Sequence, residues 1–189
     1  MLSLFTKRRG GTPHAFLVAM SGVQMGDRLL HIGCTDASQL AAVASKVGLS
    51  GRAAAAVARD ADVTRIAKAA AQAGVLVEGD VAPPGRLPYP DEDFDIVIVD
   101  NLAGQLAAMD PASRGAILDE ARRVLRPAGR VMVISEGSPH GIRALIGGTR
   151  PTTEAFEPGP LLKAHGFGTA RVLADQEGLV FVEALKPRK

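Results

Sequence analysis

The run Phe94–Asp100 limits the folds open to this chain more than any other stretch. Its residues are Phe-Asp-Ile-Val-Ile-Val-Asp, and the β-branched centre offers no polar face. A strand of this kind is buried on both sides, as in the middle of a parallel sheet. Because parallel strands need crossover connections, which are usually helices, the run predicts an α/β domain.

Short apolar segments alternate with helical patterns along the rest of the first two thirds of the chain. The spacing predicts strands at 28–32, 53–58, 75–78 and 130–135, and helices at 13–23, 37–47, 62–73 and 111–125. Propensity alone would make the alanine run 53–58 a helix. Gly51 and the cluster Asp60–Asp62 bound it as they would a buried strand, and we predict a strand. Five such β/α alternations with short connections predict a doubly wound, mostly parallel sheet.

The last third has a different pattern. Residues 136–153 are rich in Gly, Pro, Ser and Thr, and a helix is expected at 158–165. Two strands, 169–174 and 179–185, are separated by Asp-Gln-Glu-Gly and predict an antiparallel hairpin at the sheet edge. We therefore expect a flexible tail at 1–11 and a single domain at 12–189.

Charge, cysteine usage and hydropathy narrow the function classes. The formal net charge is +2, and the basic residues gather only at the two ends, which argues against a nucleic-acid surface. Cys34 is the only cysteine, so no intramolecular disulfide can form and a reducing compartment is expected. No apolar run approaches the roughly 18 residues of a membrane span. Lys7–Arg9 followed by Ala15–Met20 resembles a short signal peptide, but we favour a soluble, cytoplasmic protein.

Two stretches of the sequence resemble motifs of a known protein family. Gly79-Asp80-Val81, followed by the Leu-Pro-Tyr-Pro-Asp-Glu-Asp-Phe-Asp run at 87–95, is similar to the signature before the fourth strand of UbiE-like proteins. The run 120–130 is similar to the helix and turn before their fifth strand. Together with the terminal hairpin, these stretches resemble the class I S-adenosylmethionine-dependent methyltransferases over about residues 13–186. The resemblance implies a Rossmann-like sheet of seven strands.

The first motif of that family departs from its pattern here. The family has an acidic residue and three glycines at alternate positions, which fall on His31, Gly33, Thr35 and Ala37. Only Gly33 is kept, although glycine lets a ligand approach the backbone closely. His31 cannot supply the charge of the missing acid, which helps to hold the amino-acid end of the cofactor. We expect Gly33 to remain in the cofactor site.

The resemblance also implies which other residues would bind the cofactor. The family places an acid at the end of the second strand for the ribose hydroxyls, and Ala58 stands there. Asp60 could substitute if the turn shifts by a residue or two. Asp80, with Gly79 and Val81 beside it, matches the position that accepts from the adenine amino group. Asp100 and Asn101, which follow the fourth strand, match the floor of the site near the transferred methyl group.

Several polar residues have a simpler structural interpretation. Asp36 opens a helix and is most simply its N-cap, His31 inside an apolar strand is most simply a hydrogen-bonded core histidine, and Cys34 a packed hydrophobe. His140 in the glycine-rich loop could act as a general base, but a surface histidine is the simpler interpretation. His165 is expected at a helix C-terminus, where the dipole favours it. The histidines and the cysteine have no metal-ligand spacing, so no metal is expected.

Two functions remain open. The first is a methyltransferase that uses S-adenosylmethionine on an unidentified small molecule and releases S-adenosylhomocysteine, with no general base assigned. The second is a binding or scaffold protein that keeps the fold and has lost the cofactor, as the missing glycines and acids indicate. The chain has almost no inserted cap, so a large pocket would require a partner subunit, and a homodimer is an open expectation.

Overall fold

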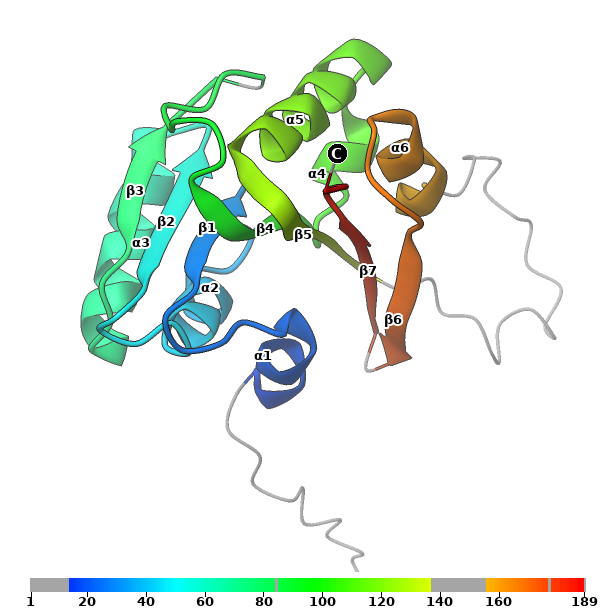
Figure 1. The fold of residues 1–189 in the computed structure, drawn as a ribbon. Helices are drawn as coiled ribbons and strands as arrows, with labels where there is room; N and C mark the ends of the chain where they lie inside the picture. The colour runs from blue at the N-terminus through cyan, green and yellow to red at the C-terminus, as the bar shows by residue number, and fades with distance from the viewer. Residues whose placement is uncertain (1–13, 84, 137–155, 177, 189) are drawn as a thin grey trace, which may run out of the picture.

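The computed structural model describes residues 14–83, 85–136, 156–176 and 178–188, and one sheet runs through all four ranges. Its strand order is β3-β2-β1-β4-β5-β7-β6 (Figure 1). The strands are β1 (Arg28–Ile32), β2 (Arg52–Val57), β3 (Glu78–Val81), β4 (Phe94–Asn101), β5 (Leu125–Glu136), β6 (Arg171–Gln176) and β7 (Leu179–Leu185). Strands β1 to β5 pair in parallel, and β7 is antiparallel to both β5 and β6. The predicted seven-stranded sheet with a terminal antiparallel hairpin is confirmed.

Helices cover both faces of the sheet, as a doubly wound fold requires (Figure 1). One face carries α1 (Ala15–Ser21), α2 (Ala37–Ala44) and α3 (Asp60–Ala73), and the other carries α4 (Gln105–Ala108), α5 (Pro111–Val124) and α6 (Pro158–Ala164). Leu118 of α5 and Leu162 of α6 pack with Leu30 and Val97 on one side. On the other side, Leu17 of α1 lies in the same cluster as the neighbouring sheet residues.

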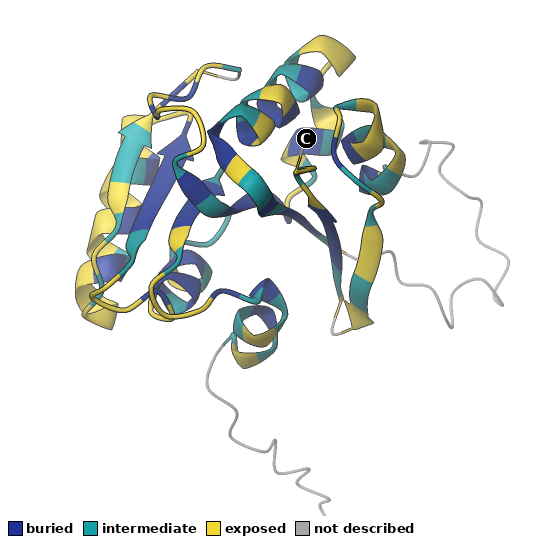
Figure 2. Cartoon of the chain, in the orientation of Figure 1, coloured by how far each residue is buried: buried dark blue, intermediate teal, exposed yellow. Residues whose placement is uncertain are grey.

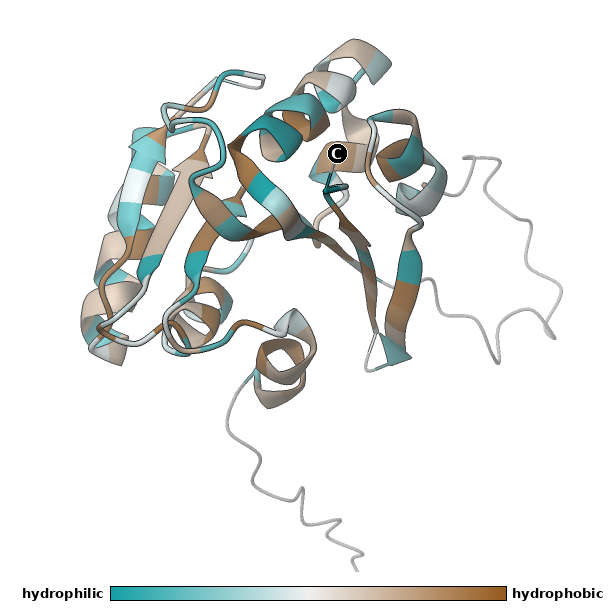
Figure 3. Cartoon of the chain, in the orientation of Figure 1, coloured by the Kyte–Doolittle hydropathy of each residue, from teal (hydrophilic) through white to brown (hydrophobic). Residues whose placement is uncertain are grey.

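The central strands are buried on both faces. Residues 96–101 of β4 are all buried, and the sheet centre is dark blue in Figure 2 and tan to brown in Figure 3. The alanine run is a strand, as predicted: Ala53 to Ala56 lie between β1 and β3 and are at most 6% exposed. Pairing with two neighbouring strands therefore overrides the helical preference of alanine.

The third strand was predicted in the wrong place. Val75, Leu76 and Val77 form a connection, and β3 begins only at Glu78. Gly74 ends α3 in the left-handed region, and the N–H of Val75 still donates to the Ala70 carbonyl of that helix. These bonds hold the apolar triplet close to the helix end, so the more polar residues that follow pair with β2 instead.

Other boundaries also differ from the sequence prediction. Strand β5 begins at Leu125, earlier than the predicted start at 130, because its pairing with β4 continues across a register shift. Helix α3 begins at Asp60, and α2 ends at Ala44, beyond which the chain forms turns. The hairpin strand β6 is shifted to 171–176. Helix α4 was not predicted, because four residues are too few for an apolar period to be visible. The tail at 1–11, Thr12, Pro13, His140 and most of the loop at 136–153 lie outside the described residues.

A buried carboxylate ties the two ends of the described chain together. Glu183 of β7 is 3% exposed and pairs with Arg130 of β5 at 3.4 Å and with Arg171 of β6 at 2.5 Å. Arg130 also donates to the carbonyl of Gly22 at 2.8 Å, just beyond the end of α1. A side chain at residue 22 would collide with this guanidinium. The first helix is therefore held by a strand more than 100 residues away.

Candidate functional site

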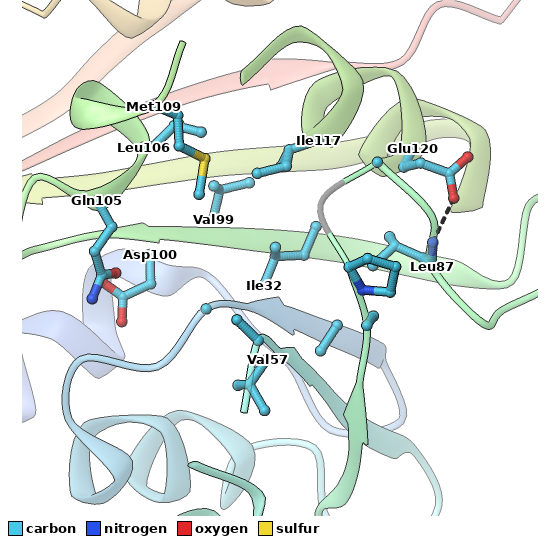
Figure 4. Close-up of a pocket in the computed structure, with 16 residues that line it drawn as sticks. Ile32, Val57, Leu87, Val99, Asp100, Gln105, Leu106, Met109, Ile117 and Glu120 are labelled. Atoms are coloured by element: carbon cyan, nitrogen blue, oxygen red, sulfur yellow. Dashed lines mark hydrogen bonds between the residues drawn. The ribbon is translucent and has the colours of Figure 1, made fainter. Parts of the chain in front are cut away.

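A cavity of about 90 Å³ lies at the carboxyl ends of β1, β2 and β4, against α4 and α5 (Figure 4). Most of its lining is aliphatic: Ile32, Ala56, Val57, Ala58, Ala82, Pro83, Leu87, Val99, Leu106, Met109 and Ile117. Gly33, Gly85, Asp100, Gln105 and Glu120 complete it. Sheet order reverses between β1 and β4, and ligands of open α/β sheets bind at such a switch point. The cavity is thus the candidate site.

Asp100 joins the loops that follow β1 and β4. Its Oδ2 accepts from the Thr35 N–H at 2.6 Å, and its Oδ1 accepts from the Thr35 hydroxyl and the Leu102 N–H, both at 2.9 Å. The side chain is only 6% exposed, so these bonds replace those that water would make. Thr35, which stands where the family has a glycine, supplies two of the three donors. Both oxygens of Asp100 are consequently engaged within the protein.

Gly33 has a structural reason to be glycine. Its φ of +81° lies in the left-handed region, which other residues rarely adopt. A Cβ there would also meet the Cβ of Asp100 at 3.4 Å. The Gly33 carbonyl oxygen lies 2.9 Å from the His31 Nδ1, and it accepts a hydrogen bond from the tautomer that carries a proton on Nδ1. The tight turn after β1 therefore depends on glycine whether or not a ligand approaches it.

His31 is a buried core histidine, in agreement with the simpler interpretation. It is 6% exposed, and desolvation by burial lowers its pKa, outweighing the opposing effects of Asp100 and the Gly33 carbonyl. The folded state therefore keeps this imidazole neutral at a pH where an unfolded chain would begin to protonate it.

We expect a pH-dependent loss of stability from this histidine. Because the folded pKa is lowered, the unfolded chain binds more protons, and the free energy of unfolding should fall as the pH drops below about 6.5. The slope contributed by one such group is at most about 1.4 kcal/mol per pH unit. Urea titrations between pH 7 and pH 5 should show this slope in wild type and a shallower one in His31→Gln. Equal slopes in the two proteins would contradict the assignment.

The wall of the cavity formed by α4 is held by side chains from two neighbouring elements. Arg114 of α5 donates to the carbonyls of Leu106 (3.1 Å), Ala107 and Met109 (both 2.8 Å). The Leu106 carbonyl also accepts from the Met109 N–H at 3.3 Å, but a four-residue helix leaves its last carbonyls without helical partners. The Asn101 side chain accepts from the Ala107 N–H at 3.1 Å. Leu106 and Met109 thereby project into the cavity (Figure 4).

The opposite wall is the segment after β3, which α5 holds through Glu120. Its Oε2 accepts from the Leu87 N–H at 2.7 Å, the dashed line in Figure 4. Arg123 donates to both carboxylate oxygens of Glu120 and to the carbonyls of Leu87 and Tyr89. The hydrogen bond from Arg123 lowers the pKa of Glu120 and keeps it ionised. Gly85 packs so closely on Ala116 that a Cβ would lie 2.6 Å from the alanine methyl.

The structure brings only two of the predicted site residues into the cavity lining, Gly33 and Asp100. Asn101 follows directly, but its side chain supports α4 and Ser135. Asp60 begins α3 and is exposed. The role of each in cofactor binding stays a prediction.

The predicted residues of β3 lie beside the cavity and not in its lining. The carboxylate of Asp80 accepts from the Tyr89 hydroxyl at 2.9 Å. Gly79 faces Val63 of α3, where a Cβ would be 3.0 Å from the nearest methyl group, and Val81 is 46% exposed. The bond engages only Oδ2 of Asp80, so it does not prevent the other oxygen from accepting from an adenine amino group.

The other polar candidates are explained structurally. Asp36 caps α2 by accepting from the Ser38 N–H at 2.8 Å. Cys34 is buried, and desolvation raises its pKa to about 11, so it is not a nucleophile at neutral pH. His165 is the C-cap of α6 and pairs with Asp119 at 2.8 Å. Within the four described ranges, no three potential ligands gather around a metal position.

Sequence reasoning missed the residues that shape the cavity walls: Arg114, Glu120, Gln105 and Met109. Arg114 stands one turn into α5 and is visible in the sequence. Its partners, however, belong to α4, which no sequence pattern predicts.

None of the helices that the structure describes is long and apolar enough to traverse a bilayer.

Comparison with known proteins gives a family and a fold. The family described as "Methyltransferase domain" matches residues 30–133. No curated protein matches the chain.

Three solved structures illustrate the fold. A SAM-dependent methyltransferase from Aquifex aeolicus is 20% identical, with a TM-score of 0.72, over 92% of this chain and 89% of its own. The [4+2]-cyclase SpnF is 16% identical, with a TM-score of 0.66, over 94% and 80%. The YcgJ protein of Bacillus subtilis is 12% identical, with a TM-score of 0.66, over 93% and 98%. At these identities the similarity shows the fold alone.

Proposed function

The chain belongs to the methyltransferase-domain family, and from this premise we propose that it transfers a methyl group from S-adenosylmethionine to a small-molecule acceptor. S-adenosylmethionine is the methyl donor of the family, and S-adenosylhomocysteine is the product. The observation that carries the proposal is the aliphatic cavity at the switch point of the sheet. Its position is where an open α/β sheet binds a nucleotide-like ligand.

The cavity suits the purine ring of the cofactor. Ile32, Val57, Leu106 and Met109 offer aliphatic surface from both sheet and helix, which favours a flat, weakly polar ring. Its volume of about 90 Å³ is small beside the roughly 300–1,000 Å³ of pockets that enclose whole ligands. The sugar and the amino-acid part would therefore lie across the open rim, beside Gln105.

Methyl transfer requires little acid–base chemistry from the protein. The cofactor supplies a methyl group on a positively charged sulfur, which is already activated for attack. The residues of this chain would position the acceptor and keep water away, and positioning alone can supply a large part of a rate enhancement. The aliphatic walls held by Arg114 and Glu120 serve this purpose. A dedicated general base is not required.

The alternative is a scaffold protein that keeps the fold without the cofactor, and one observation favours it. Both oxygens of Asp100 are occupied by Thr35 and Leu102, so the loop after β1 is already satisfied without a ligand. The SpnF match adds that a chain with this fold is named for another reaction. Binding and methyl transfer must therefore be measured separately.

Calorimetric titration with S-adenosylmethionine and S-adenosylhomocysteine tests the proposal. We expect micromolar binding by wild type and at least about tenfold weaker binding by Met109→Trp, whose indole would fill part of the cavity. Met25→Trp, at a position 80% exposed, is the matched control and should bind like wild type. Transfer of a labelled methyl group to a small-molecule pool would then establish the enzyme. Absence of binding by folded wild-type protein would favour the scaffold.

A further inference from the structure

The rim of the cavity is uncharged over the residues that the structure describes. Three of the lining residues are exposed and so mark the rim: Ala58, Pro83 and Gln105. Two are aliphatic, and the third is a neutral amide. A bound nucleoside places its polar sugar at the rim, because the enclosed part of the cavity is aliphatic. The sugar hydroxyls would therefore meet no carboxylate from these residues.

Both acids in the cavity lining, Asp100 and Glu120, are already hydrogen-bonded within the protein, and the acids of α3 lie outside the lining. Asp62 of α3 is 6% exposed and accepts from Arg59 at 2.9 and 3.0 Å and from Arg65 at 2.7 Å. Asp60 heads the same helix in solvent and is not part of the cavity lining. Inside the cavity, Asp100 and Glu120 each accept at both oxygens. A sugar hydroxyl would therefore have to share a carboxylate that the protein already uses, or reach Asp60 outside the lining.

We propose that this site recognises its nucleoside ligand through the purine ring, and that the ribose hydroxyls contribute little to affinity. The inference rests on the proposed function and adds a specificity to it. A site built to bond a hydroxyl rejects an analogue without it by large factors, because its own polar groups are left unpaired. A rim without such groups leaves no polar group of the protein unpaired when the ligand lacks a hydroxyl. This chain should therefore tolerate ligands that lack one hydroxyl.

The direct test compares S-adenosylhomocysteine with its 2′-deoxy analogue by calorimetry on the full chain. We expect dissociation constants within about threefold of each other, because no charged hydrogen bond is lost. A dissociation constant for the deoxy analogue more than about tenfold higher would overturn the inference and leave the proposed function standing. Absence of binding by both ligands would overturn the proposed function and the inference with it.

A gain-of-function variant tests the same idea independently. Ala58→Asp places a carboxylate at the rim, where it can accept from the ribose. We expect the variant to bind S-adenosylhomocysteine about tenfold more tightly than wild type and to discriminate against the deoxy analogue by a similar factor. Ala61→Asp, exposed on α3 and outside the cavity lining, adds the same charge and should change neither value. A folded Ala58→Asp protein that gains no discrimination would overturn the placement of the ribose beside residue 58.

Discussion

Asp100→Ala is expected to lower the free energy of unfolding by about 3 kcal/mol or more, the largest single effect among the residues of the cavity. The substitution removes the acceptor of two backbone N–H groups, those of Thr35 and Leu102, and of the Thr35 hydroxyl. Each buried donor left without a partner costs roughly 1–3 kcal/mol. Because Leu102 is buried and Asp100 is 6% exposed, water cannot easily take the place of the carboxylate.

Urea denaturation of a graded series of variants measures this effect. Thr35→Val removes only the hydroxyl and should cost about 1 kcal/mol. Asp119→Ala removes a carboxylate that is 66% exposed on α5 and should change stability by less than about 0.5 kcal/mol. A loss below about 1 kcal/mol in Asp100→Ala would mean that the two loops find other partners. The loop connection would then not depend on this carboxylate.

Arg114→Ala is expected to weaken binding of S-adenosylhomocysteine by at least about tenfold. The guanidinium makes three hydrogen bonds to the carbonyls of α4, each of the stronger charged kind. Without it, the helix that carries Leu106 and Met109 loses its connection to α5. Immobilising a loosened wall on binding costs affinity, which is the expected loss.

The measurement pairs calorimetry with hydrogen exchange. Arg122→Ala, on the same helix, removes a guanidinium that donates to Gly166 on another side and should bind the ligand like wild type. Amides of residues 105–109 should exchange faster in Arg114→Ala than in Arg122→Ala. Faster exchange with unchanged affinity would show that α4 is not a wall of the ligand site.

The fold could be predicted because its central elements carry strong local signals. The centre of β4, residues 96–99, is a continuous apolar run, and α5 begins after Asp110, whose side chain caps it by accepting from the Ser113 N–H. Strand β3 could not be placed the same way. It lies at the sheet edge, its four residues are partly polar, and only the register with β2 selects them over the apolar triplet before.

The candidate site was less predictable, because its bonds join residues far apart in the chain. Asp100 was expected at the right place, but its partner Thr35 lies 65 positions earlier and was identified only as a departure from the glycine motif. Glu120 likewise meets Leu87 across 33 positions. A local pattern can indicate that a polar residue ends a strand. It cannot indicate whether that residue faces a ligand or another loop.

The buried Glu183 gives the chain an order of assembly. Arg130 holds the carbonyls behind α1, and its own charge is balanced by a carboxylate close to the carboxyl end of the sequence. Helix α1 lies more than 100 residues before Arg130 in the sequence, so during synthesis the hydrogen bond from Arg130 to Gly22 can form only after β5 has emerged. Helix α1 is therefore made before the strand that holds it, and it docks only once that strand is in place.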